Sequence, residues 1–161
     1  MEISLDDAYS IKTPEDSRKL YAKWAASYEA DFVANQGYEH PKVIAEHFNH
    51  LVPTIKSVLD VGTGTGLVGK ELKKLRPNLL IDGVDISPEM LAEAKKKNVY
   101  RNLYERDLTK VTTNLESSYD SLICIGIFTH GHLPPTAIGN LIPLVRSNGY
   151  FVIGINAKYF K

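Results

Sequence analysis

The stretch Val58-Leu59-Asp60-Val61-Gly62-Thr63-Gly64-Thr65-Gly66 carries the strongest structural signal in this chain. It joins an apolar run to a turn in which glycine occupies every second position. Glycine adopts backbone dihedrals that other residues avoid, and it lets a ligand approach the main chain closely. A helical pattern follows over residues 66–75, and the first turn of a helix has free N–H groups. The stretch therefore predicts a strand, a ligand-binding turn and a helix.

The residues on either side alternate between short apolar runs and helical patterns. The expected strands are 57–61, 79–84, 99–104, 119–125 and 149–155, and the expected helices are 15–34, 41–51, 66–75, 87–97 and 134–145. Strands that alternate with helices indicate βαβ units, which predict an α/β fold with a mainly parallel sheet. The long apolar runs at 119–125 and 149–155 are typical of parallel strands that are covered on both faces.

Composition and charge narrow the class of protein. The chain has 161 residues, of which 43% are apolar and 24% charged, as expected for one globular domain. Nineteen basic residues balance nineteen acidic ones, so charge favours neither nucleic acid nor an anionic membrane as the main partner. Cys124 is the only cysteine, residues 1–10 lack a signal-peptide pattern, and no apolar run could span a bilayer. These features predict a cytoplasmic location.

Two nucleotide cofactors could use the glycine-rich turn. Residues 64–69 match the dinucleotide pattern G-x-G-x-x-G, which alone is a weak signal. Asp60 precedes the first glycine, and an acid there favours the ammonium and sulfonium of S-adenosylmethionine over a pyrophosphate. Asp85 follows Gly66 at the end of the next expected strand, where a carboxylate can accept both hydroxyls of a ribose. The pattern therefore favours S-adenosylmethionine over NAD.

At this point the sequence resembles the class I S-adenosylmethionine-dependent methyltransferases. Residues 58–66 resemble motif I of that family, and Gly83-Val84-Asp85-Ile86-Ser87-Pro88-Glu89-Met90-Leu91 is similar to its second motif. Asp107-Leu108 resembles the acidic pair at the adenine, and Tyr119-Asp120-Ser121-Leu122-Ile123-Cys124 resembles the fourth-strand motif. The resemblance implies a Rossmann-like sandwich with strand order 3-2-1-4-5.

A narrower resemblance involves the N-terminal region. Tyr21-Ala22-Lys23-Trp24-Ala25-Ala26-Ser27-Tyr28-Glu29, together with Gly64-Thr65-Gly66-Leu67-Val68, resembles the methyltransferase-like proteins of the Williams–Beuren syndrome region. The likeness covers about residues 17–157. It implies a single domain over 1–161, with a flexible lead-in at 1–14, N-terminal lid helices at 15–52 and a cofactor-binding core at 57–157.

The resemblance also implies roles for individual residues. Those that would contact the cofactor are Tyr21, Trp24, Tyr28, Asp60, Gly62, Thr63, Gly64, Gly66, Asp85, Ile86, Met90, Asp107, Leu108 and Ile125. The three aromatic residues would form a lid, and the glycine-rich turn with its preceding acid would surround the methionine part. Asp85 would bind both ribose hydroxyls, Ile86 and Met90 would lie against adenine, and Asp107 with Leu108 would close its far end.

Several of these residues also fit a purely structural interpretation. Leu20, Trp24, Tyr28 and Phe32 recur every four residues, so they can also form the core-facing stripe of one helix. Asp107 can cap a turn.

The segment Thr129-His130-Gly131-His132 follows the fourth expected strand, at the edge where α/β proteins bind ligands. His130 is our candidate for a catalytic residue, because a histidine there could deprotonate or orient the methyl acceptor. The simpler reading is a polar loop. Histidines 47, 50, 130 and 132 lack the carboxylate or cysteine spacing of a metal centre, so we predict none.

Function and assembly follow as expectations. The favoured function is methyl transfer to a small-molecule or protein acceptor. The alternatives are a cofactor-binding module that is non-catalytic or needs a partner, and, less favoured, an NAD-dependent oxidoreductase. The Asn/Asp-Pro-Pro-Tyr/Phe motif of amino-methylating enzymes is absent, since residues 133–136 read Leu-Pro-Pro-Thr. The family usually adds an antiparallel strand pair after the fifth strand, so we expect either a truncated chain or a naturally short form that makes a homodimer through the exposed edge of the fifth strand.

Overall fold

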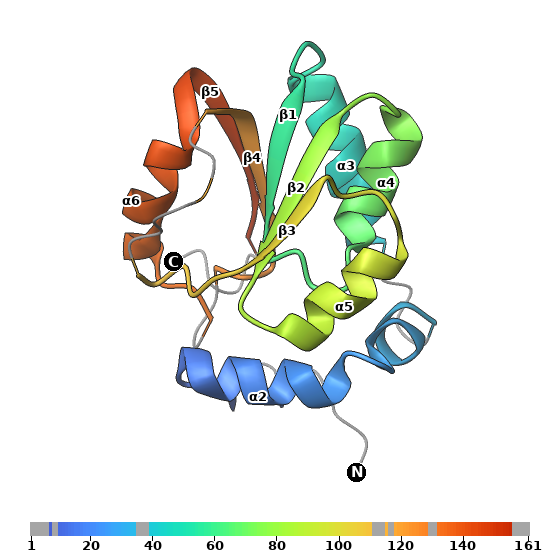
Figure 1. The fold of residues 1–161 in the computed structure, drawn as a ribbon, viewed down its shortest axis with the longest axis vertical. Coiled ribbons are helices and arrows are strands. Elements are labelled where there is room, and N and C mark those ends of the chain that lie inside the picture. The colour runs from blue at the N-terminus through green and yellow to red at the C-terminus, as the bar shows by residue number, and fades with distance from the viewer. Residues whose placement is uncertain are drawn as a thin grey trace.

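The described residues form one five-stranded parallel sheet with helices on both sides (Figure 1). The computed structural model describes residues 7, 10–34, 39–110, 115, 118–128 and 132–155. The strands are β1 (Ser57–Val61), β2 (Leu80–Asp85), β3 (Asn102–Glu105), β4 (Tyr119–Ile125) and β5 (Val145–Gly154). Their order, β3-β2-β1-β4-β5, confirms the predicted α/β fold and strand order.

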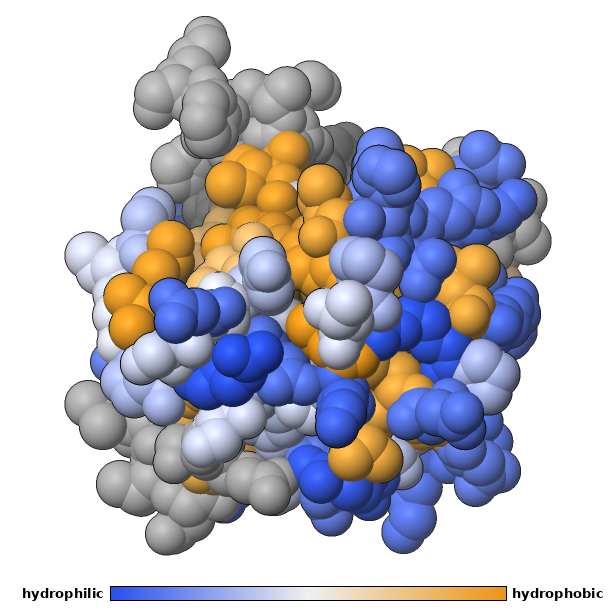
Figure 2. Space-filling model, turned by 90° about the horizontal axis from the view of Figure 1, so that it is seen from above, coloured by the Kyte–Doolittle hydropathy of each residue, from blue (hydrophilic) through white to orange (hydrophobic). Residues whose placement is uncertain are grey.

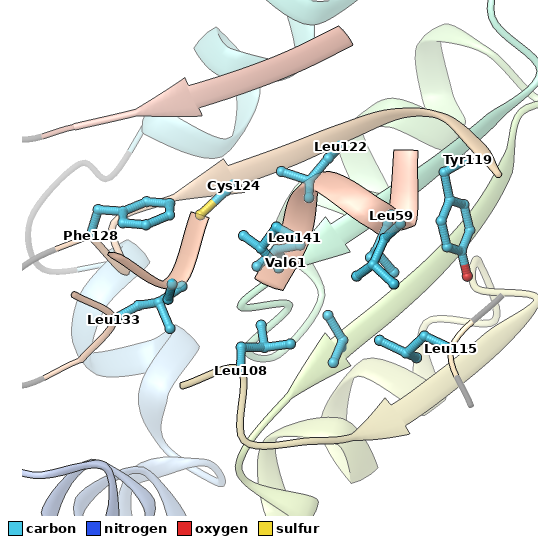
Figure 3. Close-up of a cluster of buried hydrophobic side chains, with 13 residues drawn as sticks. Leu59, Val61, Leu108, Leu115, Tyr119, Leu122, Cys124, Phe128, Leu133 and Leu141 are labelled. Atoms are coloured by element: carbon cyan, nitrogen blue, oxygen red, sulfur yellow. The ribbon is translucent and has the colours of Figure 1, made fainter. Parts of the chain in front are cut away.

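Strand β1 lies at the centre of the sheet, where it pairs with β2 on one side and β4 on the other. Alternate residues of a strand point to opposite faces. Val58 accordingly belongs to a buried cluster with Phe48 and Leu72, which come from the helices over one face. Leu59 belongs to a second cluster on the opposite face, shown in Figure 3, to which Leu141 contributes. The centre of the sheet is therefore buried on both faces, which confirms the prediction for the run 119–125. The prediction is wrong for 149–155, because β5 lies at the edge of the described sheet and leaves Tyr150 and Phe151 exposed.

Helices α3 (His40–Leu51), α4 (Leu67–Leu75) and α5 (Pro88–Lys96) lie on one side of the sheet in Figure 1. The opposite side carries η2 (Pro135–Ala137), α6 (Ile138–Leu141) and η3 (Ile142–Leu144). These three short pieces replace the single helix predicted over 134–145. Pro143 lacks the N–H that a continuous helix needs at that position, so the helical turn tightens and ends there.

Strand β5 begins earlier than predicted, at residue 145 instead of 149. The parallel register pairs Tyr119 with Val145 and Ser121 with Tyr150, so residues 146–149 lie opposite Asp120 alone. Asn148 takes a φ of 63° within this bulge, a conformation that asparagine tolerates better than most residues. Residues 146–148, which lie between the predicted helix and the predicted strand, are therefore part of an insertion inside β5.

The N-terminal helix is shorter than predicted. Helix α2 (Pro14–Trp24) begins one residue before its predicted start, where the Thr13 hydroxyl caps it by accepting the N–H of Asp16 at 3.1 Å. It ends at Trp24, and a π-helix, η1 (Glu29–Ala34), follows after a turn. The Ser27 N–H donates to the Trp24 carbonyl, three residues back, at 3.0 Å, which closes a tight turn where a helix would continue, and the Trp24 indole N–H donates to Asp31 at 3.1 Å. The single helix predicted over 15–34 is therefore wrong.

Nothing in the sequence pattern singles out Asp82, yet its buried carboxylate accepts hydrogen bonds from Arg101, Asn102 and Tyr119. Its side chain has no exposed surface, and it accepts hydrogen bonds from Arg101 Nη2 at 2.7 Å and the Tyr119 hydroxyl at 2.6 Å. Burial raises the pKa of Asp82, but the hydrogen bonds from Arg101 and Tyr119 outweigh it, so the pKa lies below its usual value. Asp82 is therefore ionised and paired at neutral pH.

Replacing Asp82 with alanine should strongly destabilise the fold. Asp82→Ala removes the acceptor that Arg101 and Tyr119 share, and a hydrogen bond to a charged group contributes about 1.5–3 kcal/mol. Urea unfolding measures the change. Glu93→Ala is the control, because Glu93 pairs with Lys96 at 2.6 Å on the surface, where an ion pair contributes about 1 kcal/mol at most. Equal losses in the two variants would contradict the role assigned to Asp82.

Candidate cofactor-binding site

The turn between β1 and α4 needs its glycines. Gly62, Gly64 and Gly66 have φ values of 72°, 54° and 88°, in the left-handed region that other residues adopt at a cost. The Gly62 N–H donates to the carbonyl of Val84 at 2.9 Å, which ties the turn to the end of β2. Gly66 is the N-cap of α4. The alternate glycines thus form a compact turn at the carboxyl edge of the two central strands.

Asp85 connects the glycine-rich turn to the turn between β2 and α5. Strand β2 ends at Asp85, as the motif predicted. Its Oδ2 accepts the N–H of Gly64 at 2.8 Å, and its Oδ1 accepts the N–H of Ser87 at 2.9 Å. Burial raises the pKa of Asp85, and the backbone N–H groups of Ser87 and Gly64 oppose that rise. One carboxylate thus brings the two predicted motifs together at the carboxyl edge of the sheet.

Asp60 lies beneath the turn. Only 2% of Asp60 is exposed, and its Oδ2 accepts the Tyr100 hydroxyl at 2.7 Å. Burial raises the pKa of Asp60 to about 7; the nearby charge of Asp85 adds to the rise, while the Tyr100 hydroxyl and the Gly69 N–H oppose it. Thr63 is buried beside it and donates to the Asp60 carbonyl at 2.8 Å. Both side chains lie inside the protein and support the turn from below.

The aromatic residues predicted as a lid do come together. The ring of Tyr21 stacks on that of Trp24 with centroids 6.1 Å apart, and Tyr28 meets Trp24 edge-on at 5.0 Å. Trp24 is 2% exposed, whereas Tyr21 and Tyr28 are half-buried. The Trp24 side chain is thus buried within the N-terminal segment, but the predicted stripe along one helix is not formed, because α2 ends at Trp24. The side chain of Phe32 lies outside the description.

The N-terminal segment is attached to the carboxyl edge of the sheet at three points. Figure 1 shows α2 crossing that end of the molecule. Arg18 pairs with Glu105 at the end of β3 at 3.1 Å, and Lys97, just after α5, pairs with Glu29. The Tyr21 hydroxyl oxygen lies 3.0 Å from Nε2 of His132, in the connection that follows β4. The segment thus covers the edge where Asp85 and the glycine-rich turn lie.

Residues of the second motif follow Asp85 directly. The Ser87 hydroxyl caps α5 by accepting the N–H of Met90 at 3.2 Å. Ile86 is half-buried, and Met90 is 2% exposed on the inner side of α5. Ile125, the last residue of β4, is half-buried before Gly126, whose φ is 70°.

The pair 107–108 lies in a local turn. Asp107 Oδ1 accepts the Thr109 N–H at 3.0 Å and the Thr109 hydroxyl at 2.6 Å, so the turn-capping reading describes its observed contacts. Leu108 is buried in the cluster of Figure 3 with Leu59 and Leu141. Their predicted roles at the adenine stay predictions.

One candidate residue is not described by the structure, and two contacts at the site were not predicted from the sequence. His130, the catalytic candidate, is outside the described residues. His132 is described, and its contact with Tyr21 was not foreseen, because the two are far apart in the chain. Tyr100 was also missed, since the 99–104 run reads only as a weak strand. Among the described residues, no group of His, Cys, Asp and Glu could hold a metal, and no helix could span a membrane.

Known proteins with similar sequences are methyltransferases. The chain is 30% identical over 100 residues to malonyl-[acyl-carrier protein] O-methyltransferase of Halalkalibacterium halodurans, covering 58% of this chain and 36% of that protein. It is 32% identical over 115 residues to release factor glutamine methyltransferase of Enterococcus faecalis, covering 59% and 38%. The chain thus spans little more than a third of these relatives.

Solved structures share the fold. The DhpI complex with SAH matches with a TM-score of 0.66 and 21% identity, covering 89% of this chain and 70% of that one. A TehB-like SAM-dependent methyltransferase from Corynebacterium glutamicum matches with a TM-score of 0.66 and 22% identity, covering 85% and 73%. Residues 59–151, more than half of the chain, match the methyltransferase domain family. Together with the glycine-rich turn, Asp85 and the strand order, this match shows that the chain belongs to the methyltransferase domain family.

Proposed function

We propose that this protein is an S-adenosylmethionine-dependent methyltransferase that acts on a small-molecule or protein acceptor. The observation that supports this most strongly is the Asp85 carboxylate, held by the N–H groups of Gly64 and Ser87 beside the left-handed glycine turn. A carboxylate fixed at the end of the second strand can accept ribose hydroxyls. Relatives named as methyltransferases support the same activity.

The residues at the turn suit S-adenosylmethionine. A Cβ placed on Gly64 would meet no atom closer than 4.0 Å, so the outer side of the turn is open to a ligand. Asp60 lies inside the protein beneath the turn, near Asp85, and the negative charge of the two carboxylates favours a cationic ligand over a pyrophosphate. The cofactor supplies a methyl group already activated on a sulfonium. The chain therefore has to bind, orient and cover it, which Asp85, the turn and the N-terminal segment would do.

Transfer of a labelled methyl group tests the activity. We expect incorporation from methyl-labelled S-adenosylmethionine into an acceptor of the kind named for one relative, a malonyl thioester on acyl carrier protein. A release factor, the acceptor named for another relative, should stay unlabelled, because the Asn/Asp-Pro-Pro-Tyr/Phe motif is absent. Cofactor binding without transfer to any acceptor would favour the alternative of a non-catalytic or partner-dependent module.

The narrower assignments are also proposals. Residues 21–29 support membership of the Williams–Beuren syndrome region group, because Tyr21, Trp24 and Tyr28 form one aromatic cluster. A cytoplasmic location is supported by the single, buried Cys124.

We further propose that the outer edge of β5 pairs with a second copy. Figure 2 shows apolar side chains gathered at the surface of one face. On β5 itself, Tyr150 is 48% and Phe151 37% exposed, and within the described residues the strand pairs only with β4. Light scattering after size-exclusion chromatography should give a dimer, and Phe151→Lys should give a monomer. A monomer at every concentration of the unmodified chain would contradict this pairing.

A further inference from the structure

Tyr100 makes a contact that joins distant parts of the chain. It lies between α5 and β3, forty positions after Asp60, and its hydroxyl donates to Asp60 Oδ2 at 2.7 Å. Its ring is half-buried and packs against the apolar cluster that contains Val58 and Leu72. Burial and the charge of Asp60 raise the pKa of Tyr100 well above its usual value, so the phenol remains a protonated donor.

The start of α4 is shaped to admit this ring. A Cβ on Gly69 would lie 2.3 Å from the Tyr100 hydroxyl oxygen, and a Cβ on Gly66 would lie 3.0 Å from the ring. Glycine inside a helix costs up to about 1 kcal/mol relative to alanine, so its presence at position 69 needs a reason. The reason is the phenol. Gly69, which completed the dinucleotide pattern in the sequence, therefore makes room for Tyr100 and says nothing about a pyrophosphate.

The surroundings of Asp60 make this hydrogen bond consequential. The groups that face its carboxylate are Asp85 from β2, Cys124 from β4, the Gly69 N–H from α4 and the Tyr100 hydroxyl. Asp85 is a like charge and burial disfavours ionisation, whereas the hydroxyl stabilises the ionised form. Because its pKa is about 7, Asp60 changes charge near neutral pH, and a small change in its partners alters its charge.

We propose that Tyr100 is a positioning residue for cofactor binding: its hydroxyl holds Asp60 in place, and ionised, beneath the glycine-rich turn. The inference rests on the proposed function, because the ligand that benefits is the cationic S-adenosylmethionine. Affinity for it should fall as the pH drops through the range in which Asp60 gains its proton. Without the hydroxyl, the pKa of Asp60 rises further, so the fall should begin at higher pH. Near neutral pH the loss in Tyr100→Phe should be roughly tenfold.

Three variants separate this role from a merely structural one. Tyr100→Phe removes the hydroxyl, and Gly69→Ala displaces it by steric contact. Tyr119→Phe is the matched control. It removes a similarly short hydrogen bond, of 2.6 Å, from Tyr119 at the start of β4 to the buried carboxylate of Asp82 in β2. We expect the first two to shift the pH profile of S-adenosylmethionine affinity upward and the third to leave it unchanged.

Two measurements decide the outcome. Calorimetry from about pH 6 to about pH 9 gives the affinity profile, and carbon-13 NMR of the ligand-free chain follows the Asp60 carboxyl, assigned with Asp60→Asn. Tyr100→Phe should move the midpoint upward in both. A wild-type midpoint in Tyr100→Phe, in a chain that binds S-adenosylmethionine, would overturn the inference alone. A wild-type chain that titrates at Asp60 but binds no S-adenosylmethionine would overturn the proposed function, and the positioning role with it.

Discussion

Asp85→Ala should lower the affinity for S-adenosylmethionine by about 100-fold or more. The variant loses a carboxylate that can accept two ribose hydroxyls, and hydrogen bonds to a charged group contribute about 1.5–3 kcal/mol each. It also leaves the N–H groups of Gly64 and Ser87 without the acceptor that joins their two turns. Calorimetric titration with S-adenosylmethionine measures the loss.

Asp120→Ala is the matched control for this experiment. Asp120 Oδ2 also accepts two backbone N–H groups, those of Lys56 at 2.6 Å and Ser57 at 3.1 Å, but at the opposite edge of the sheet. Both variants should lose stability, because each leaves two N–H groups unpaired. Only Asp85→Ala should lose affinity. Similar affinities in the two variants would mean that Asp85 is structural and that the cofactor binds elsewhere.

The second large effect concerns Gly66. A Cβ there would lie 3.1 Å from the Cα of Ala94, which is backbone and cannot move away, and the φ of 88° disfavours any side chain. The left-handed conformation costs about 1–2 kcal/mol and overpacking about 1–3 kcal/mol, so Gly66→Ala should lower the unfolding free energy by roughly 2–4 kcal/mol. Urea unfolding measures the change.

Two other glycines supply the comparison. Gly64 has a φ of 54° but open space around its Cβ position, so Gly64→Ala should cost only about 1–2 kcal/mol of stability while weakening cofactor binding. Gly139 lies in α6 with no atom near its Cβ position and no positive φ, so Gly139→Ala should be neutral or stabilising. Gly66→Ala and Gly139→Ala of equal stability would refute the conformation described for the turn.

The fold could be predicted from the sequence because its strongest signals are local. Strands β1 and β4 have the bounds that their apolar runs predicted, and α2 and α5, capped by Thr13 and Ser87, begin within one residue of their predicted starts. Elements whose ends carry no local sequence signal were placed wrongly. Helix α2 stops at Trp24 in a tight turn closed by Ser27, which no glycine or proline marks, and β5 starts early because its bulge forms only against β4.

In the candidate site, too, the features with a local sequence signal were predicted and those that depend on distant contacts were not. Asp85 and the glycines lie together because strand ends and turns place them there, and the motif spacing anticipates this. The sequence could not reveal the hydrogen bond between Asp60 and Tyr100, because Tyr100 is brought beside Asp60 only when the sheet forms. The turn cap at Asp107 was one of two hypotheses from the sequence, whereas the burial of Leu108 in the core could not be read from the motif.

Titration of the unmodified chain with S-adenosylmethionine, S-adenosylhomocysteine and NAD, followed by calorimetry, tests the central claim most directly. The proposed function predicts micromolar binding of the first two, each to one site, and no binding of NAD. A folded chain that binds NAD, or binds none of the three, would contradict it.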